Sequence, residues 1–180
     1  MSRHLKGHFH RTHTDKGVLS WIKEEFGIQT MLDVGCGPGG MEKDAKSLDI
    51  EWTGIDGDPS LKKENIITHD FTKGDVYSSK CDLVWCVEFV EHVDEEFVPN
   101  FVPSLCRGEM LVLTAAPPGK AGHHHVNCKR KKYWIELLTD VGLTYSKSLT
   151  ETMRKKSTMK RNFIRERGMF FFNQAAPPKA

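Results

Sequence analysis

Short apolar runs alternate with amphipathic segments along most of the chain, and this alternation predicts strands separated by helices. The apolar runs predict strands at residues 31–34, 51–55, 65–71, 83–86, 109–115, 143–149 and 169–173. The amphipathic segments predict helices at 16–26, 41–48 and 129–141, and a helix broken by Pro99 and Pro103 within 93–106. We therefore predict a doubly wound α/β sheet of about seven strands.

The two ends of the chain are expected to lie outside this folded unit. Residues 1–17 are polar and rich in histidine, which predicts a flexible leader. Its histidines could also bind a metal, and His13 with Thr14 could close over a ligand. Residues 18–174 then form one domain, long enough to fold around a hydrophobic core. Residues 175–180 (AAPPKA) are expected to be a disordered tail.

The overall composition favours an ordinary globular protein. The chain is 38% hydrophobic and 28% charged, and its net charge of +2 does not demand a nucleic-acid partner. The five cysteines form no C-x-x-C pair, which favours free thiols in a reducing compartment. The N-terminus has no apolar targeting segment, and no run is long enough to span a membrane. We therefore expect a cytoplasmic protein without a membrane partner.

The stretch Thr30–Gly40 (TMLDVGCGPGG) combines a short strand with a glycine-rich turn that opens a helix. Such a turn lets a ligand approach the backbone, and the N–H groups at a helix start favour polar or anionic ligand groups. The glycines also satisfy the dinucleotide pattern G-x-G-x-x-G. However, Asp33 would repel a pyrophosphate, whereas it would attract a ligand that carries an ammonium and a sulfonium group.

The run D-V-G-C-G-P-G resembles motif I of class I S-adenosylmethionine (SAM)-dependent methyltransferases. The similarity extends from about Thr30 to Leu149, and E-F-V-E-H resembles the segment that follows the fourth strand in that family. The resemblance implies SAM as the cofactor, methyl transfer as the reaction, and a Rossmann-like, mostly parallel sheet. It also implies that strand 169–173 is the one antiparallel strand and lies beside strand 109–115.

The residues expected to contact the cofactor lie at strand ends. Asp56 ends the second strand at the distance beyond the glycines where an acidic residue binds ribose hydroxyls, although Asp56 and Asp58 could simply make a turn. Asp33 is expected near the amino acid moiety. By resemblance, Asp70 accepts a bond from the adenine amino group and Phe71 packs on the ring, unless Phe71 is core. The remaining expected contacts are Gly35, Cys36, Gly37, Gly39, Gly57 and, on the methionine side, Glu88.

The catalytic candidates are histidines. His92 could serve as a general base or could brace its segment structurally. The loop 116–127 is a candidate substrate loop because it is rich in proline and glycine at a strand end. Within it, His123, His124 and His125 could act on the acceptor, bind a metal together with His92, or be ordinary loop residues. Consecutive residues point in different directions, so at most two of these three can serve one centre. We assign no metal from the sequence.

A basic zone covers residues 129–132 and 153–167, and it could receive an acidic substrate or nucleic acid, or be a solvated helix face. We predict a SAM-dependent methyltransferase that acts on an unidentified acceptor, with a small molecule favoured. The alternatives are a nucleic-acid or protein methyltransferase guided by the basic zone, and a non-catalytic SAM-binding module.

Overall fold

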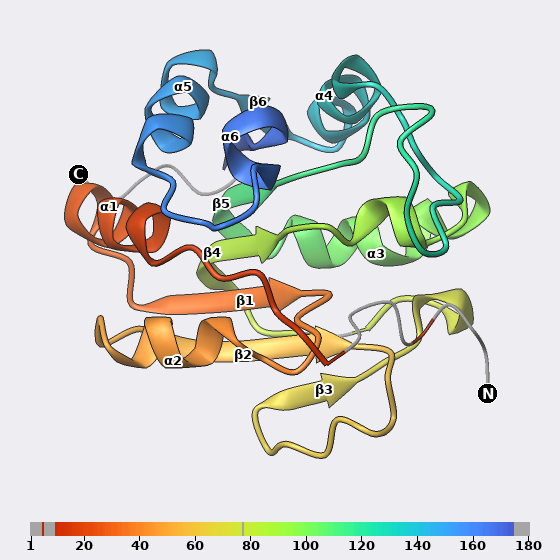
Figure 1. Ribbon diagram of the computed structural model, residues 1–180, viewed down its shortest axis with the longest axis horizontal. Helices are drawn as coiled ribbons and strands as arrows, with labels where there is room; N and C mark the ends of the chain where they lie inside the picture. The colour runs from red at the N-terminus through yellow and green to blue at the C-terminus, as the bar shows by residue number, and fades with distance from the viewer. Residues whose placement is uncertain (1–4, 6–9, 77, 175–180) are drawn as a thin grey trace.

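A seven-stranded sheet in the order β3-β2-β1-β4-β5-β7-β6 forms the centre of the computed structural model, which describes residue 5, residues 10–76 and residues 78–174 (Figure 1). The strands are β1 (Thr30–Val34), β2 (Glu51–Asp56), β3 (Ile66–Thr68), β4 (Cys81–Cys86), β5 (Gly108–Leu113), β6 (Leu143–Tyr145) and β7 (Met169–Asn173). Only β7 runs antiparallel to its neighbours β5 and β6. The predicted doubly wound sheet with one antiparallel strand is therefore confirmed.

Helices cover both faces of the sheet. They are α1 (Lys16–Phe26), α2 (Met41–Lys46), α3 (Val98–Leu105), α4 (Lys131–Asp140), α5 (Lys147–Lys156) and α6 (Phe163–Arg167). Buried residues of α1, α2, α5 and α6 share one core with one side of the strands, and α1 and α5 contact each other. Buried residues of α3 and α4 share a second core with the opposite side. Alternate residues of β4 and β5 enter opposite cores, as expected for central strands buried on both faces.

Three predicted elements depart most from the observed bounds. The strand predicted at 65–71 ends at Thr68, because Asp70 caps a 3₁₀ turn at Phe71–Lys73. The strand predicted at 143–149 ends at Tyr145, because Ser146 caps helix α5 by accepting a hydrogen bond from the backbone N–H of Leu149. The helix predicted within 93–106 is a 3₁₀ turn at Glu95–Phe97 followed by α3, which contains both prolines: Pro99 lies in its first turn, where no N–H is required, and Pro103 lies inside it.

The chain before α1 packs on the domain over its described residues. Asp15 is fully buried, and its carboxylate accepts hydrogen bonds from the N–H groups of Val18, at the start of α1, and Thr158. The predicted leader boundary at residue 17 stays a prediction. Residues 1–4 and 6–9 of that leader and the predicted tail at 175–180 lie outside the described residues.

Two further expectations concern free thiols and membrane-spanning segments. All five cysteines are free thiols. Among the helices of the described residues, none combines the length and the apolar character that crossing a membrane requires.

Candidate active site

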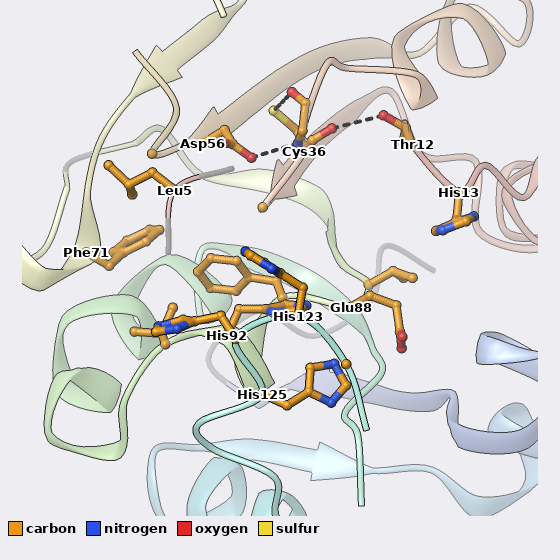
Figure 2. A pocket seen from close by; sticks show the side chains of 18 of the residues that line it. Leu5, Thr12, His13, Cys36, Asp56, Phe71, Glu88, His92, His123 and His125 are labelled. Carbon is orange, nitrogen blue, oxygen red and sulfur yellow. Dashed lines mark hydrogen bonds between the residues drawn. The ribbon is translucent and has the colours of Figure 1, made fainter. Parts of the chain in front are cut away.

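One large cavity, of about 1100 Å³, opens at the carboxyl ends of the parallel strands. Open α/β sheets bind their ligands at this edge. Figure 2 shows Thr12, Cys36 and Asp56 on one wall, and Glu88, His92, His123 and His125 on the opposite wall. The first wall comes from the glycine-rich loop and the segment before α1. The second wall comes from the loops that follow β4 and β5. The cavity therefore lies between the two groups of residues that the sequence singled out.

The glycine-rich loop after β1 is held against the end of β2. The N–H groups of Gly35 and Cys36 donate to the carbonyl of Ile55 at 2.8 and 3.1 Å. Gly35 has φ +76°, and a Cβ atom there would lie 2.4 Å from the Phe89 ring, so a side chain is excluded on two grounds. Gly35, Cys36 and Gly37 line the cavity, as predicted from the sequence. Gly39 does not line it: a Cβ atom at that residue would approach the Trp52 ring instead.

Asp33 is a buried carboxylate on the cavity wall. It is 3% exposed, and its Oδ2 accepts a hydrogen bond from Nε1 of Trp52 at 3.3 Å. Burial raises the pKa of Asp33 to about 7; the Trp52 bond opposes this shift and the charge of Asp56 adds to it. A cationic ligand group in the cavity would stabilise the ionised form of this side chain.

Asp56 ends β2 with its carboxylate fixed by the backbone. Its Oδ2 accepts from the N–H of Gly37 at 2.8 Å, and its Oδ1 accepts from the N–H of Asp58 at 2.9 Å. Asp70 is held in a similar way, because its Oδ1 accepts from the N–H and hydroxyl of Thr72. Phe71 is 4% exposed and packs against Phe89, so it belongs to the core and also lines the cavity. Gly57 lines the cavity too.

Glu88 occupies a left-handed backbone position, with φ +57°, directly after β4. Thr114 orients it: the N–H of Glu88 donates to the Thr114 hydroxyl at 2.8 Å, and that hydroxyl donates to Oε1 at 3.0 Å. Arg167, from the end of α6, donates to Oε2 at 3.0 Å. Burial raises the pKa of Glu88, and the charge of Arg167 opposes that shift. Glu88 therefore lines the cavity as an oriented, ion-paired carboxylate.

The 3₁₀ turn Val90–His92 brings a second carboxylate and an imidazole to the far wall. Glu91 is fully buried, and burial, followed by the charge of Glu88, raises its pKa to about 8. Burial, followed by the charge of His125, lowers the pKa of His92 to about 4, although hydrogen bonding to the backbone of His123 and His124 opposes the shift. The imidazole of His92 is therefore neutral at physiological pH.

All three histidines of the loop after β5 line the cavity. The ring of His125 lies 5.0 Å from the ring of His92, edge to face, and its Nδ1 bonds to the carbonyl of Lys120 at 2.8 Å. His123 is exposed, and His124 has φ +48°. The ligand atoms of Glu91, His92 and His125 all lie within 4.8 Å of one another. The structure thus brings the side chain of His125, and the backbone of His123 and His124, to His92.

Several residues of the cavity were missed by sequence reasoning. Glu91 is the second acid of E-F-V-E-H, and its spacing before His92 was the available signal. Arg167 was noted only as part of the basic zone. Thr12 binds the glycine-rich loop, accepting from the N–H of Gly40 at 3.0 Å and donating to the carbonyl of Cys36 at 3.3 Å. Of His13 and Thr14, which were expected as a possible cover for a ligand, His13 lines the cavity and contacts Phe163, whereas Thr14 is not part of the lining.

The basic zone is largely engaged with its own surroundings. Lys129 pairs with Glu95, and Lys132 lies 3.5 Å from Glu136. Arg154 donates to the carbonyl of Gly168 at 3.1 Å, and Arg165 donates to Asn162. Lys155, Lys156, Lys160 and Arg161 are exposed. Part of this charge is therefore engaged within the protein, and part of it faces solvent.

The fold and the site define the class of protein. The strand order, the single antiparallel strand and the glycine-rich loop at a cavity are those of a class I methyltransferase. Residues 32–108 match a family described as "Methyltransferase domain". A comparison with curated protein sequences gave no match.

Solved methyltransferases share this fold at low sequence identity. The methyltransferase domain of bacterial CtHen1-C is 16% identical, with a TM-score of 0.59, over 89% of this chain and 97% of that chain. A SAM-dependent methyltransferase from Archaeoglobus fulgidus is 17% identical, with a TM-score of 0.57, over 87% and 90%. Magnesium protoporphyrin IX methyltransferase from Synechocystis PCC 6803, solved with bound SAM, is 17% identical, with a TM-score of 0.57, over 86% and 74%.

The family match over residues 32–108 and the fold shared with these solved structures support a class I SAM-dependent methyltransferase with SAM as its cofactor. The donor set of the cavity fits this cofactor. SAM carries an ammonium and a sulfonium group, and Asp33, Asp56 and Glu88 place three carboxylates on the cavity wall. The part of the cavity wall that carries these carboxylates suits such a cation better than it suits a pyrophosphate.

Proposed function

We propose that this methyltransferase acts on a small-molecule acceptor, held beside the cofactor in the one large cavity. The carrying observation is that this cavity, about 1100 Å³ in volume, runs without interruption from Asp56 to His125. Pockets for drug-sized ligands are about 300–1,000 Å³, so the cavity can accommodate SAM together with a small acceptor. The engagement of Lys129, Arg154 and Arg165 with their own neighbours also favours a small acceptor over a polyanion.

The residues divide into a cofactor wall and an acceptor wall. Asp33 holds the ammonium group of the cofactor, Asp56 its ribose, and Asp70 with Phe71 its adenine. When bound, SAM supplies an electrophilic methyl group on a positively charged sulfur. His92 and His125 lie on the opposite wall, where they can stabilise the nucleophilic form of the acceptor. Alignment of the two molecules supplies most of the rate enhancement that such a transfer requires.

The test is a screen for S-adenosylhomocysteine formation with separate panels of small hydroxyl, amine and carboxylate acceptors, nucleic acids, and proteins. We expect turnover with a small acceptor. Its rate should change little between 50 and 500 mM salt, because a strong salt dependence of binding arises from contacts to many phosphates, each of which adds about one unit to the slope of log affinity against log salt concentration. Turnover with nucleic acids or proteins alone would contradict the proposal.

A matched pair of variants separates the cavity from the basic surface. Asp56→Ala removes a carboxylate of the cofactor wall and should abolish turnover. Lys155→Glu combined with Lys156→Glu reverses two exposed charges outside the cavity lining and should leave turnover with a small acceptor unchanged. Loss of turnover with a nucleic-acid acceptor in the charge-reversed variant would favour the nucleic-acid alternative.

A further inference from the structure

The acceptor wall holds a cluster of side chains whose composition matches a metal site. Glu91 and His92 come from the turn after β4, and His125 comes from the loop after β5. One ligand atom from each lies within 4.8 Å of the others. One carboxylate and two imidazoles form a donor set that suits divalent transition metals.

Unpartnered polar atoms give independent support for a ligand at this cluster. Oε1 and Oε2 of the fully buried Glu91 and Nδ1 of His92 have no hydrogen-bond partner of regular geometry among the described residues, although the backbone N–H groups of Glu91 and Ala116 favour the ionised Glu91 carboxyl. Buried polar groups are nearly always hydrogen-bonded, and each exception calls for an explanation such as an ion. A cation bound between Glu91 and His92 would satisfy these atoms together.

The protein also orients the cluster as metal sites require. The carbonyl of Lys120 can only accept, so Nδ1 of His125 donates to it, at 2.8 Å, and Nε2 is the ring nitrogen that remains for a metal. Metal-binding histidines commonly donate their second ring nitrogen to a carbonyl in this way. The loop itself is fixed to Glu91, whose backbone carbonyl accepts from the N–H groups of Val126 and Asn127 at 3.0 and 3.1 Å. The two segments that supply the three side chains are therefore tied together.

We infer that Glu91, His92 and His125 bind a divalent transition metal ion, and that this ion holds a hydroxyl group of the methyl acceptor. The second part rests on the proposed function. A bound metal lowers the pKa of a coordinated hydroxyl and presents its oxygen as a nucleophile. The oxygen lone pair then forms the new bond to the methyl carbon as the carbon–sulfur bond breaks. The electron pair of that bond stays on sulfur, and the hydroxyl proton passes to water.

Cobalt binding tests the site without any acceptor. The protein is freed of its purification tag, treated with EDTA, and titrated with Co²⁺ while the visible absorption of the ion is recorded. We expect one Co²⁺ per chain, displaced by Zn²⁺. Glu91→Gln and His125→Asn should each weaken binding by at least the roughly 10- to 100-fold seen when supporting residues of metal sites are lost.

Control variants make the result specific. His124→Asn changes the neighbouring histidine to a residue that tolerates its left-handed backbone, and it should bind Co²⁺ as the wild type does. Binding of S-adenosylhomocysteine by Glu91→Gln and His125→Asn reports that both are folded. The metal site is refuted if the wild type binds no Co²⁺, or if both variants bind it unchanged. It is also refuted if the signal disappears instead in a variant of the N-terminal histidines, His8→Asn with His10→Asn.

Activity measurements distinguish the failure of this inference from the failure of the proposed function. Turnover of a small acceptor that persists unchanged after EDTA treatment would refute the role of the metal and leave the small-molecule proposal intact. Co²⁺ binding at the cluster, combined with turnover of macromolecular acceptors alone, would keep the metal site and refute the small-molecule proposal.

Discussion

Replacing Asp33 by asparagine should remove most of the pH dependence of cofactor binding. Burial raises the pKa of Asp33 to about 7, and the proposed contact with the ligand ammonium requires the ionised carboxylate. Below the pKa, each pH unit adds about 1.36 kcal/mol to the free energy needed to ionise it. Since half of the groups are ionised at pH 7 and about 1% at pH 5, binding of S-adenosylhomocysteine to the wild type should weaken by about 50-fold, or about 2.3 kcal/mol, between these pH values.

Calorimetric titration with S-adenosylhomocysteine from pH 5 to pH 8.5 measures this effect. Asp33→Asn keeps an oxygen that can accept from Trp52 but cannot ionise, so its affinity should be lower at pH 8 and should vary much less with pH. The difference between the two profiles isolates Asp33 from the other titrating groups of the cavity. Parallel profiles for the wild type and Asp33→Asn would refute the assignment.

The same pKa shift predicts an effect on the stability of the protein without ligand. An unfolded aspartate has a pKa of about 3.9, so between about pH 4 and pH 7 the folded state binds more protons than the unfolded state. The free energy of unfolding therefore decreases across that window, by about 4 kcal/mol from this group, and the effect is complete above pH 7. Urea denaturation should show Asp33→Asn to be more stable than the wild type at pH 8 but not at pH 4. A less stable variant at pH 8 would contradict the shift.

Three further substitutions, with Ser146→Ala as a reference for the third, test the cofactor wall, the core and the segment before α1. Asp56→Asn replaces one of the two carboxylate oxygens, which accept hydrogen bonds from Gly37 and Asp58, by an NH₂ group that cannot accept. Calorimetry should show S-adenosylhomocysteine binding weaker by about 1–3 kcal/mol. Unchanged affinity would count against a contact between Asp56 and the ribose. Phe101→Ala removes a fully buried ring between α3 and the sheet and should lower the free energy of unfolding in urea by about 3–5 kcal/mol; a loss below about 1 kcal/mol would contradict its place in the core. Asp15→Ala removes the cap of α1 together with the acceptor of the Thr158 N–H, whereas Ser146→Ala removes the cap of α5 and should lower the free energy of unfolding by about 1 kcal/mol. Asp15→Ala should therefore lower the free energy of unfolding in urea by more than Ser146→Ala does. Equal losses would argue against a stabilising role for the bond between Asp15 and Thr158.

The central part of the fold could be predicted from local pattern. Apolar runs marked β1, β4 and β5 because strands buried on both faces are nearly continuous in apolar residues. The edges were less predictable. Residues 147–149 have an apolar and polar pattern compatible with a strand, yet the cap at Ser146 and the packing of α5 on α1 place them in a helix.

The cofactor wall was also largely predictable, because its residues follow strand ends directly. Asp33, Asp56 and Asp70 all line the cavity, as expected from their positions. The acceptor wall was not predictable to the same degree. His125 reaches His92 only because the backbone of Val126 and Asn127 bonds to Glu91, and no local pattern encodes that contact between distant segments.

A crystal structure with S-adenosylhomocysteine bound tests the central claim most directly. We predict the adenosine between Asp56 and Phe71, the ammonium group near Asp33, and the sulfur directed across the cavity toward His92 and His125. A molecule bound elsewhere, or one whose sulfur faces away from those histidines, would contradict the account.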